Sequence, residues 1–398
     1  MKICLLNYDG MPTVTGAVCR RVGGLNVSLF HLAKNLAQIP GVNVSTVFRR
    51  EASGAEKIEN VSPVSIPAGP AKVLSRENLE VYIPEFTENL LRYIREANPD
   101  IVHTSGSEAG YAMSILRKGG LTTSWVHTNY ATLAARRVVA FGLPKTEAVS
   151  DSIGRRELLC LEECDLVLSY SDVDRDEIHG IFDIPLTKIA KITKGVDTQT
   201  FKVTGDNSPR ENIVVSAGRM AEIKDYPFLF EAFRQVCDLW SQAENLSLLL
   251  IGGNSIEREG LGLTKLAQEL DILKRIRFID GVPQKQLASY LGRAKVFAGT
   301  SRHETFGMLP VEARACGTPF VVRSNSSYVE TVRDGFGGWL ADNADPLDMA
   351  HKISSILNLS DTKWARMSSD AIRSTEPYSW SVSAKECYEI YQKVLSNS

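Results

Sequence analysis

Short apolar stretches alternate with amphipathic stretches along most of the chain. Residues 2–8 form an apolar run of strand type, and apolar residues then recur at helical spacing from Val27 to Leu36. A second series of the same kind begins at residues 212–219, after a polar, turn-rich segment at 204–210. Parallel strands need crossover connections, which are usually helices. The pattern therefore predicts an α/β protein with two doubly wound sheets.

The remaining strand-like runs are short, and several of them end in polar residues or glycine. Ligands of doubly wound sheets bind at the carboxyl ends of the strands, so these ends are where a site is expected. One long amphipathic stretch, residues 79–97, predicts a helix that ends near Asn98-Pro99. The other predicted strands occupy residues 42–48, 100–106, 122–130, 166–171, 189–197, 246–253, 277–283, 296–300 and 320–322.

A polar loop after the strand at 296–300 leads into a short predicted helix. Pro310 suits the first turn of this helix, and Gly317 suits its end. Backbone N–H groups at a helix N-terminus favour an anion such as phosphate. The loop therefore predicts an anion site at the amides of Phe306, Gly307, Met308 and Leu309.

Two carboxylates flank this loop, Glu304 just before the amides and Glu312 just inside the helix. Carboxylates do not attract an anion, but they accept hydrogen bonds from neutral hydroxyl groups. A sugar on one side of a diphosphate and a ribose on the other would satisfy both. The competing interpretation is an ordinary helix with acids in its first turn.

A pair of cations follows the predicted strand at 212–219. Arg219 is expected at the end of the strand and Lys224 at the start of the next helix, so both can converge on one diphosphate. Fixed cations of this kind can replace a divalent ion in neutralising a leaving group. The alternative is two surface cations.

The first predicted strand leads into a glycine-bearing loop that ends at Gly23-Gly24. The loop lacks the G-x-G-x-x-G pattern, so a nicotinamide cofactor is poorly supported. These glycines allow the backbone to approach a phosphate or a sugar, or they form a tight turn that serves packing alone.

Two histidines fall at the ends of predicted strands. His127 is expected to be functional, whereas His103 fits mainly a structural role. Asp172 and Asp174 have the D-x-D spacing of some metal sites. Ser171 is expected to cap a helix whose first turn holds both acids, so no metal site is predicted there.

Length and composition limit the possible functions. A chain of 398 residues suggests two domains, and 43% hydrophobic with 23% charged residues is typical of a globular protein. A net charge of −2 does not favour nucleic acid as a partner. No apolar run is long enough for a transmembrane helix or a signal peptide. Seven scattered cysteines fit reduced thiols, so a cytoplasmic protein is expected.

The motifs together resemble the retaining GT-B glycosyltransferases, which include sucrose-phosphate synthases and inositol-phosphate GlcNAc transferases. The matching elements are Glu304-x7-Glu312, Gly218-Arg219 with Lys224, Gly23-Gly24 and Gly195-Val196-Asp197. Two positions depart from the family pattern: Lys194 replaces the usual Asn, and Asp225 replaces the commoner glycine. The resemblance implies two facing Rossmann-like domains with a cleft between them. It places an acceptor domain at 1–200, a donor domain at 201–375 and a helix crossing back to the first domain at 376–398.

The resemblance also assigns roles to individual residues. The expected catalytic residues are His127, Arg219, Lys224 and Glu304. The expected donor contacts are Gly23, Gly24, Gly253, Val282, Thr305, Phe306, Gly307, Met308, Leu309 and Glu312. The expected acceptor contacts are Asn26, His103, Thr128, Tyr130, Arg155 and Arg156, although the two arginines also fit a solvated basic face.

The implied activity is the transfer of a hexose, of the glucose or GlcNAc type, from a UDP-linked donor to a small polar or phosphorylated acceptor. Retention of configuration is expected, with no metal or cofactor. The open alternatives are a transferase that uses GDP- or UDP-sugars with lipid or glycan acceptors, a nucleotide-sugar epimerase of the same fold, and a non-catalytic binding protein. The oligomeric state stays open, with a homodimer as one option.

Overall fold

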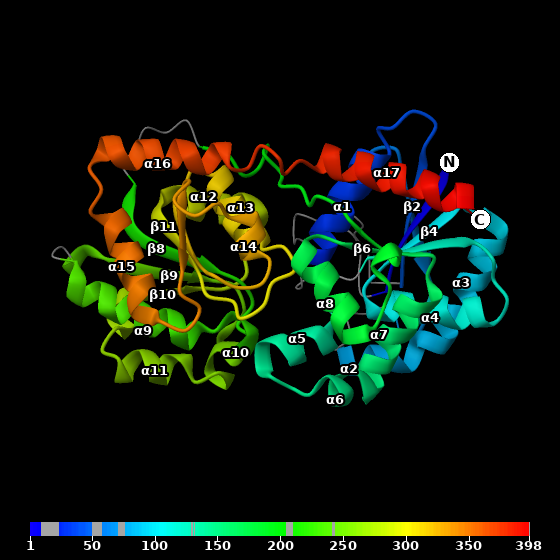
Figure 1. Ribbon diagram of the computed structural model, residues 1–398, viewed down its shortest axis with the longest axis horizontal. Coiled ribbons are helices and arrows are strands. Elements are labelled where there is room, and N and C mark those ends of the chain that lie inside the picture. The colour runs from blue at the N-terminus through cyan, green and yellow to red at the C-terminus, as the bar shows by residue number, and fades with distance from the viewer. Residues whose placement is uncertain are drawn as a thin grey trace. The chain divides into compact units, whose positions relative to one another are not determined.

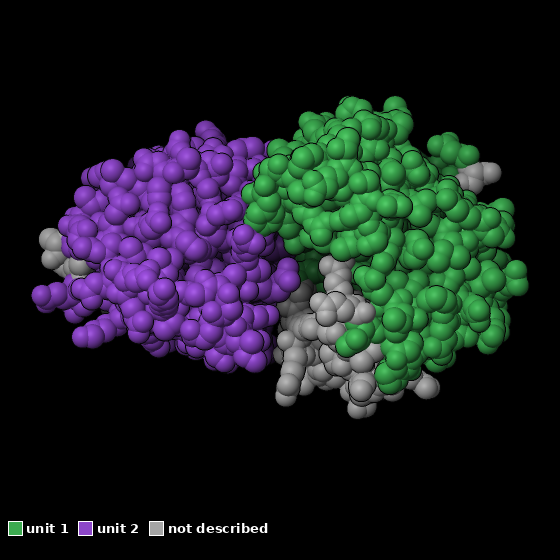
Figure 2. Space-filling view, turned by 90° about the horizontal axis from the view of Figure 1, so that it is seen from below, with its two compact units in different colours: residues 1–195, 379–398 green, residues 196–378 purple. Residues whose placement is uncertain are grey.

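The computed structural model describes residues 1–8, 24–49, 58–70, 76–128, 130, 132–203, 210–240 and 243–397. The described chain divides into two compact units (Figures 1 and 2). Unit 1 comprises Met1–Gly195 with Ser379–Ser398, and unit 2 comprises Val196–Tyr378. These bounds lie within five residues of the limits expected from the sequence. Gly23 and most of the polar segment at 204–210 lie outside the described residues.

Unit 1 contains a parallel sheet of seven strands in the order β3-β2-β1-β4-β5-β6-β7. The sequence pattern did not predict β3, and it predicted a longer β7. The strands are β1 (Lys2–Asn7), β2 (Asn43–Arg49), β3 (Val61–Ile66), β4 (Ile101–Ser105), β5 (Ser124–Thr128), β6 (Leu166–Ser169) and β7 (Ile189–Lys191).

The helices of unit 1 cover this sheet with a buried apolar core that includes Leu6, Phe86, Val102, Trp125 and Val167. The predicted helix at 79–97 is interrupted: Leu79 ends a short α-helix, Glu80–Tyr82 form a 3-10 turn, and a second α-helix begins at Ile83. The helices are α1 (Gly24–Leu36), α2 (Arg76–Leu79), α3 (Ile83–Ala97), α4 (Ser107–Lys118), α5 (Leu133–Phe141), α6 (Lys145–Ser150), α7 (Ser152–Glu163) and α8 (Asp172–Phe182), with a 3-10 turn at Leu186–Lys188.

The last helix of the chain, α17 (Trp380–Asn397), belongs to unit 1 and lies along α1 (Figure 1). The rings of His31 and Trp380 stack with their centroids 5.4 Å apart. Thr193 donates to the carboxylate of Glu386 through both its backbone N–H and its hydroxyl. These contacts attach the C-terminal segment to the N-terminal fold.

Unit 2 contains a parallel sheet of six strands in the order β10-β9-β8-β11-β12-β13. Its strands are β8 (Glu211–Ala217), β9 (Ser247–Ile251), β10 (Ile276–Ile279), β11 (Ala294–Gly299), β12 (Phe320–Arg323) and β13 (Gly338–Ala341). Its helices are α9 (Tyr226–Leu239), α10 (Ser255–Gly260), α11 (Leu263–Glu269), α12 (Gln284–Arg293), α13 (Met308–Ala315), α14 (Tyr328–Thr331), α15 (Pro346–Leu357) and α16 (Asp361–Arg373), with 3-10 turns at Glu222–Lys224, Ala243–Asn245 and Leu273–Arg275.

The strand order of each sheet reverses direction at one place, between β1 and β4 in unit 1 and between β8 and β11 in unit 2. At such a switch point the connections leave to opposite sides, and a crevice opens at the carboxyl ends of the two strands. The fold therefore places a ligand-binding edge beside Ala217 and Gly299 in unit 2. Within the described ranges, no helix has an apolar stretch long enough to cross a bilayer.

Candidate functional site

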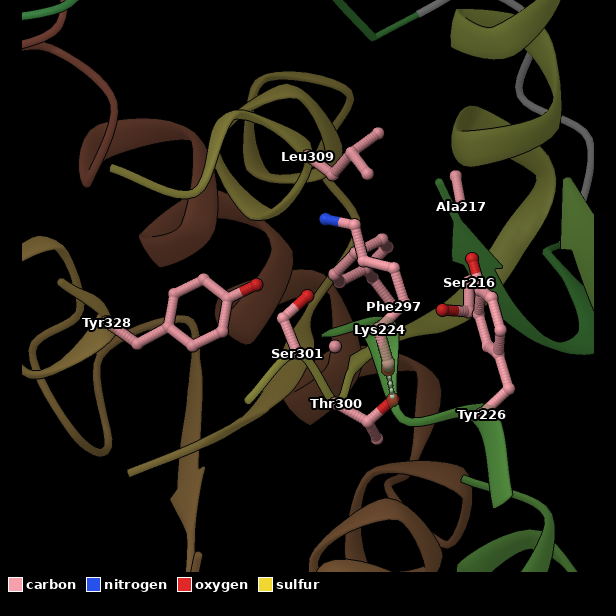
Figure 3. Close-up of a pocket in the computed structure, with 10 residues that line it drawn as sticks. Ser216, Ala217, Lys224, Tyr226, Phe297, Thr300, Ser301, Leu309 and Tyr328 are labelled. Atoms are coloured by element: carbon pink, nitrogen blue, oxygen red, sulfur yellow. Dashed lines mark hydrogen bonds between the residues drawn. The ribbon is translucent and has the colours of Figure 1, made fainter. Parts of the chain in front are cut away.

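A small pocket lies at the carboxyl ends of β8 and β11, where the sheet of unit 2 changes direction (Figure 3). Its lining combines an ammonium group with several hydroxyl groups, a composition suited to an anionic, hydroxylated ligand. The lining residues are Ser216, Ala217, Lys224, Tyr226, Phe297, Gly299, Thr300, Ser301, Leu309 and Tyr328.

Lys224, which lines this pocket, contacts Glu304 although the two residues lie 80 positions apart in the chain. The Lys224 Nζ atom is 2.5 Å from Oε1 of Glu304, and both side chains are about one-fifth exposed. In Figure 3 the ammonium group of Lys224 lies on the side of Leu309, the second residue of α13. The structure thus brings two of the predicted catalytic residues together beside the predicted anion loop.

The surroundings of Glu304 favour its ionised form. Burial by itself would raise the pKa of this carboxyl group, but Lys224, Ser301 and His303 outweigh burial and hold the pKa below its ordinary value. Glu304 is therefore a carboxylate at neutral pH, able to accept hydrogen bonds from hydroxyl groups.

The helix α13 begins at Met308, shortly after Glu304 in the chain, and Gly307 is its N-cap. Gly307 adopts φ +83°, in the left-handed region. A Cβ atom at this position would lie 2.4 Å from Cε1 of Tyr328. Backbone conformation and packing therefore both require glycine here. The helix begins two residues before Pro310, slightly earlier than the sequence predicted.

Among the predicted donor contacts, Leu309 lines this pocket. Thr305, Phe306 and Glu312 are buried, whereas Met308 and Val282 are half-buried. Arg219 is exposed in the loop after β8, and within the described part of the chain its side chain has no hydrogen bond or ion pair. At Gly253, a Cβ atom would lie 2.3 Å from Cγ of Met220, so packing alone already requires glycine there.

Two tyrosines of the pocket were missed by the sequence analysis. Tyr226 and Tyr328 are each 2% exposed, and burial raises the pKa of both phenols, with Glu304 adding to the effect. Both hydroxyl groups therefore stay protonated, and the Tyr226 hydroxyl has no hydrogen-bond partner among the described residues. A tyrosine in the first turn of an amphipathic helix looks like a core residue in sequence, so no signal marked either one.

In unit 1, His127 lies at the end of β5 and is 2% exposed. Its Nδ1 atom is 2.7 Å from Oγ1 of Thr104, and its ring packs over Gly110 of α4. Burial lowers its pKa to about 4, so His127 is neutral at physiological pH. It can offer a hydrogen bond but not a positive charge.

His103 is fully buried, and both of its ring nitrogens have protein partners. Nε2 is 2.6 Å from Oγ1 of Thr128, and Nδ1 is 2.6 Å from the hydroxyl of Tyr391 on α17. Burial, with the nearby His127, lowers its pKa to about 3. His103 and Thr128 therefore bind each other, and His103 also binds Tyr391 of α17. The expected contact of these two residues with an acceptor stays a prediction.

The remaining acceptor candidates of unit 1 lie in different settings. Asn26 is buried and accepts a hydrogen bond from Asn7, and Tyr130 is half-buried and accepts one from Tyr170. Arg155 is exposed and donates to a backbone carbonyl. Arg156 is bound to Glu80 at 2.7 Å. Gly24 begins α1 and is exposed, whereas Gly23 lies outside the described residues.

The prediction for Ser171 is confirmed. Its side chain accepts a hydrogen bond from the backbone N–H of Asp174 and caps α8. Asp172 forms ion pairs with Arg175 and Lys191. In the parts of the chain that the structure describes, no three His, Cys, Asp or Glu side chains lie close enough to hold a metal ion.

The two buried histidines predict how stability depends on pH. In the unfolded chain a histidine takes up a proton below about pH 6.5, whereas His103 and His127 do so only near pH 3 and 4 in the folded protein. The unfolded state binds more protons between these limits, so stability is full above pH 6.5 and falls as the pH drops, by about 2 kcal/mol per histidine at pH 5. Thermal unfolding of His103→Gln at pH 7 and pH 5 should show a smaller pH effect than the wild type.

The matched control is His351→Gln, which removes an exposed histidine on α15. That variant should keep the wild-type difference between the two pH values. An unchanged difference in His103→Gln would contradict the assignment of His103 as a buried neutral group.

Comparison with known proteins agrees with this architecture. The family model described as Glycosyl transferases group 1 matches residues 197–373, and the model described as Glycosyltransferase Family 4 matches residues 22–200. A D-inositol 3-phosphate glycosyltransferase of Corynebacterium urealyticum is 27% identical over 99% of this chain and 96% of its own length. The protein of the same name from Frankia alni is 28% identical over 94% of this chain and 95% of its own length.

Solved structures show the same fold. Sucrose-phosphate synthase from Thermosynechococcus elongatus aligns over 100% of both chains with a TM-score of 0.84 and 24% identity. Anabaena HepE, in complex with UDP and glucose, aligns over 99% of this chain and 100% of its own with a TM-score of 0.75 and 16% identity. The two family models together match residues 22–373, and both units contain a parallel α/β sheet. The chain therefore belongs to the group 1 glycosyltransferases of the family 4 type, with the GT-B fold.

Proposed function

We propose that this protein is a retaining hexosyltransferase that uses a nucleotide-diphosphate sugar, UDP-linked, as its donor. The observation that carries the proposal is the pairing of Lys224 with Glu304 at the switch point of unit 2, directly before the N-terminus of α13. A cation and a helix N-terminus attract the phosphates, and the ionised Glu304 accepts hydrogen bonds from sugar hydroxyls.

The chemistry of the leaving group follows from this arrangement. As the glycosidic bond opens, negative charge develops on the departing diphosphate. Lys224 and the amides at 306–309 are expected to stabilise that charge without reorganising, which is the main way in which a preorganised site lowers a barrier. The exposed Arg219 is expected to add its charge once the donor is bound. In this proposal Glu312 contacts the ribose, and His127 acts as a neutral hydrogen-bonding group.

The names of the similar proteins support the choice of substrates. The sequence relatives are named D-inositol 3-phosphate glycosyltransferases, which favours a small phosphorylated acceptor. The structural neighbour HepE was solved with UDP and with UDP-glucose, which favours a uridine donor. We therefore propose a small polar or phosphorylated hydroxyl compound as acceptor.

We further propose that the leaving phosphate helps to deprotonate the acceptor on the same face of the sugar, so that the anomeric configuration is retained without a metal ion. The protein groups named above supply the positive charge in place of a metal ion.

The six cysteines that the structure describes are free thiols, which agrees with the proposed location in the cytoplasm.

A two-stage experiment tests the proposal. Thermal shift with UDP-, GDP- and ADP-sugars identifies the donor, and mass spectrometry with inositol phosphates and sugar phosphates then detects the product. A UDP-sugar should raise Tm, and transfer should continue at its full rate in excess EDTA. NMR of the product should show the anomeric configuration of the donor.

Three outcomes would contradict this proposal. Strict dependence on magnesium or manganese would exclude the metal-independent mechanism. Inverted product would exclude retention. Conversion of the nucleotide-sugar in the absence of any acceptor would identify an epimerase instead.

A further inference from the structure

Asp225, the residue after Lys224, is the centre of a buried charge cluster. Its side chain is 8% exposed, and its Oδ2 atom lies 2.9 Å from Nε of Arg302 and 2.6 Å from a terminal nitrogen of Arg323. Oδ1 accepts a second hydrogen bond from Arg302 at 3.3 Å. One carboxylate thus meets two guanidinium groups, and the charge of Glu222 also acts on Arg302.

The same cluster joins the two loops that carry Lys224 and Glu304. The hydroxyl of Thr300 donates to the backbone carbonyl of Lys224 at 2.8 Å, and the backbone N–H of Arg302 donates to the carbonyl of Ile223 at 2.8 Å. Arg323 reaches from β12 to the carbonyl of Thr300 at 3.2 Å. The loop after β8 and the loop after β11 are thereby fixed to each other.

Arg323 is itself held in place, so it provides a rigid support for Asp225. Its guanidinium group lies 4.2 Å from the ring centroid of Phe228, and it also donates to the backbone carbonyl of Asn343. A cation over an aromatic face with fixed hydrogen bonds has little freedom to move. The carboxylate of Asp225 is therefore anchored from the core side, while Arg302 approaches it from the side of the Glu304 loop.

Backbone conformation alone does not explain an aspartate at this position. Asp225 has φ +49°, where glycine has no steric cost and aspartate is only tolerated. A buried carboxylate is unfavourable unless it is paired with cations. An aspartate here is physically reasonable when its charge organises Arg302 and Arg323.

We infer that Asp225 is a positioning residue: its carboxylate, through Arg302 and Arg323, holds Lys224 at the distance from Glu304 that donor chemistry needs. The inference rests on the proposed function for its catalytic consequence. Its structural part, the dependence of the Lys224–Glu304 pair on Asp225, stands independently of that function.

The first test does not use activity. Thermal unfolding of Lys224→Met, Glu304→Gln and the double variant gives the coupling between these two side chains as a non-additive change in Tm. The cycle is then repeated in the Asp225→Asn background. We expect a clear coupling in the wild-type background and its loss with Asp225→Asn. An equal coupling in both backgrounds would overturn the inference, whether or not the protein transfers sugar.

The second test measures turnover with Asp225→Asn and Asp225→Gly. Both variants should lower kcat about 10- to 100-fold, with a smaller change in the KM of the donor, because a displaced Lys224 affects the developing charge more than it affects ground-state binding. Asp225→Gly relieves the left-handed backbone, so wild-type kcat in this variant would show that only the backbone mattered. In the Lys224→Met background, Asp225→Asn should lower kcat only slightly further. If it lowered kcat there by the same factor as in the wild-type background, action through Lys224 would be refuted.

Asp271 supplies the matched control. It also has a left-handed backbone, with φ +55°, but it is exposed in the loop between α11 and β10. Asp271→Asn and Asp271→Gly should leave kcat and the Lys224–Glu304 coupling at wild-type values. The wild-type protein could show the coupling and yet neither bind a nucleotide-sugar nor transfer its sugar. That outcome would refute the proposed function and still support the positioning role of Asp225.

Discussion

Lys224→Met is expected to lower kcat by about 10²- to 10³-fold, the effect seen when one preorganised donor is removed from a developing negative charge. Methionine keeps the length and most of the volume of lysine but has no ammonium group. The KM of the donor should change less than kcat, because the base and ribose contacts of the ground state remain. Steady-state kinetics by release of nucleoside diphosphate measures both constants.

The stability of this variant should depend on pH in a defined direction. Without Lys224, burial becomes the dominant influence on Glu304, and its pKa should rise from its lowered wild-type value. In the wild type, the lowered pKa of Glu304 contributes stability that is present above the ordinary pKa of a glutamic acid and is lost as the pH falls. Lys224→Met should therefore gain less stability than the wild type as the pH rises through this range.

Glu304→Gln is the matched partner for this experiment. Breaking an ion pair on one side leaves an uncompensated charge, so the Lys224→Met/Glu304→Gln double variant should be at least as stable at pH 7 as Lys224→Met alone. kcat should be lower than in the wild type by at least about 10²-fold in all three variants. Wild-type kcat in either single variant would refute the assignment of the site, and a double variant much less stable than Lys224→Met would refute the coupling described here.

Gly307→Ala is expected to abolish donor binding and transfer while the rest of the fold is retained. The added Cβ meets two obstacles, a left-handed backbone at φ +83° and the ring of Tyr328 at 2.4 Å. Backbone strain of this kind costs about 1–3 kcal/mol, and the contact displaces either Tyr328 or the first turn of α13. Because both carry groups of the pocket, the amides should no longer face the phosphates. Loss of the Tm shift with the donor measures the effect.

Two variants separate the causes of that loss. Gly262→Ala imposes a left-handed backbone at φ +65° with no atom within 4 Å of the new Cβ, so it should cost stability without affecting donor binding. Tyr328→Leu combined with Gly307→Ala removes the ring that the Cβ meets and should recover part of the binding if packing dominates. A normal donor-induced shift in Gly307→Ala would show that the N-terminus of α13 does not hold the donor.

The amino-acid sequence by itself determined the local structure. The alternation of apolar strands with amphipathic helices required two parallel α/β sheets, because that pattern depends only on neighbours within about ten residues. Ser171 could be identified as a helix cap, and Gly317 as a helix end, for the same reason. The sequence also predicted donor-site roles for Lys224, Glu304, Gly307 and Glu312, and these roles stay predictions.

Only the tertiary structure decided which of these side chains meet. Lys224 contacts Glu304 because β8 and β11 are neighbours in the sheet, and strand order is not encoded in local periodicity. Local periodicity likewise does not show that His103 contacts Tyr391, which lies 288 positions further along the chain. Nor does it show that Arg156 forms an ion pair with Glu80. The cluster around Asp225 brings together two loops and the end of β12, so its charges became interpretable only with the distances between them. Chemistry of single residues is local, whereas pairing across a sheet depends on the whole topology.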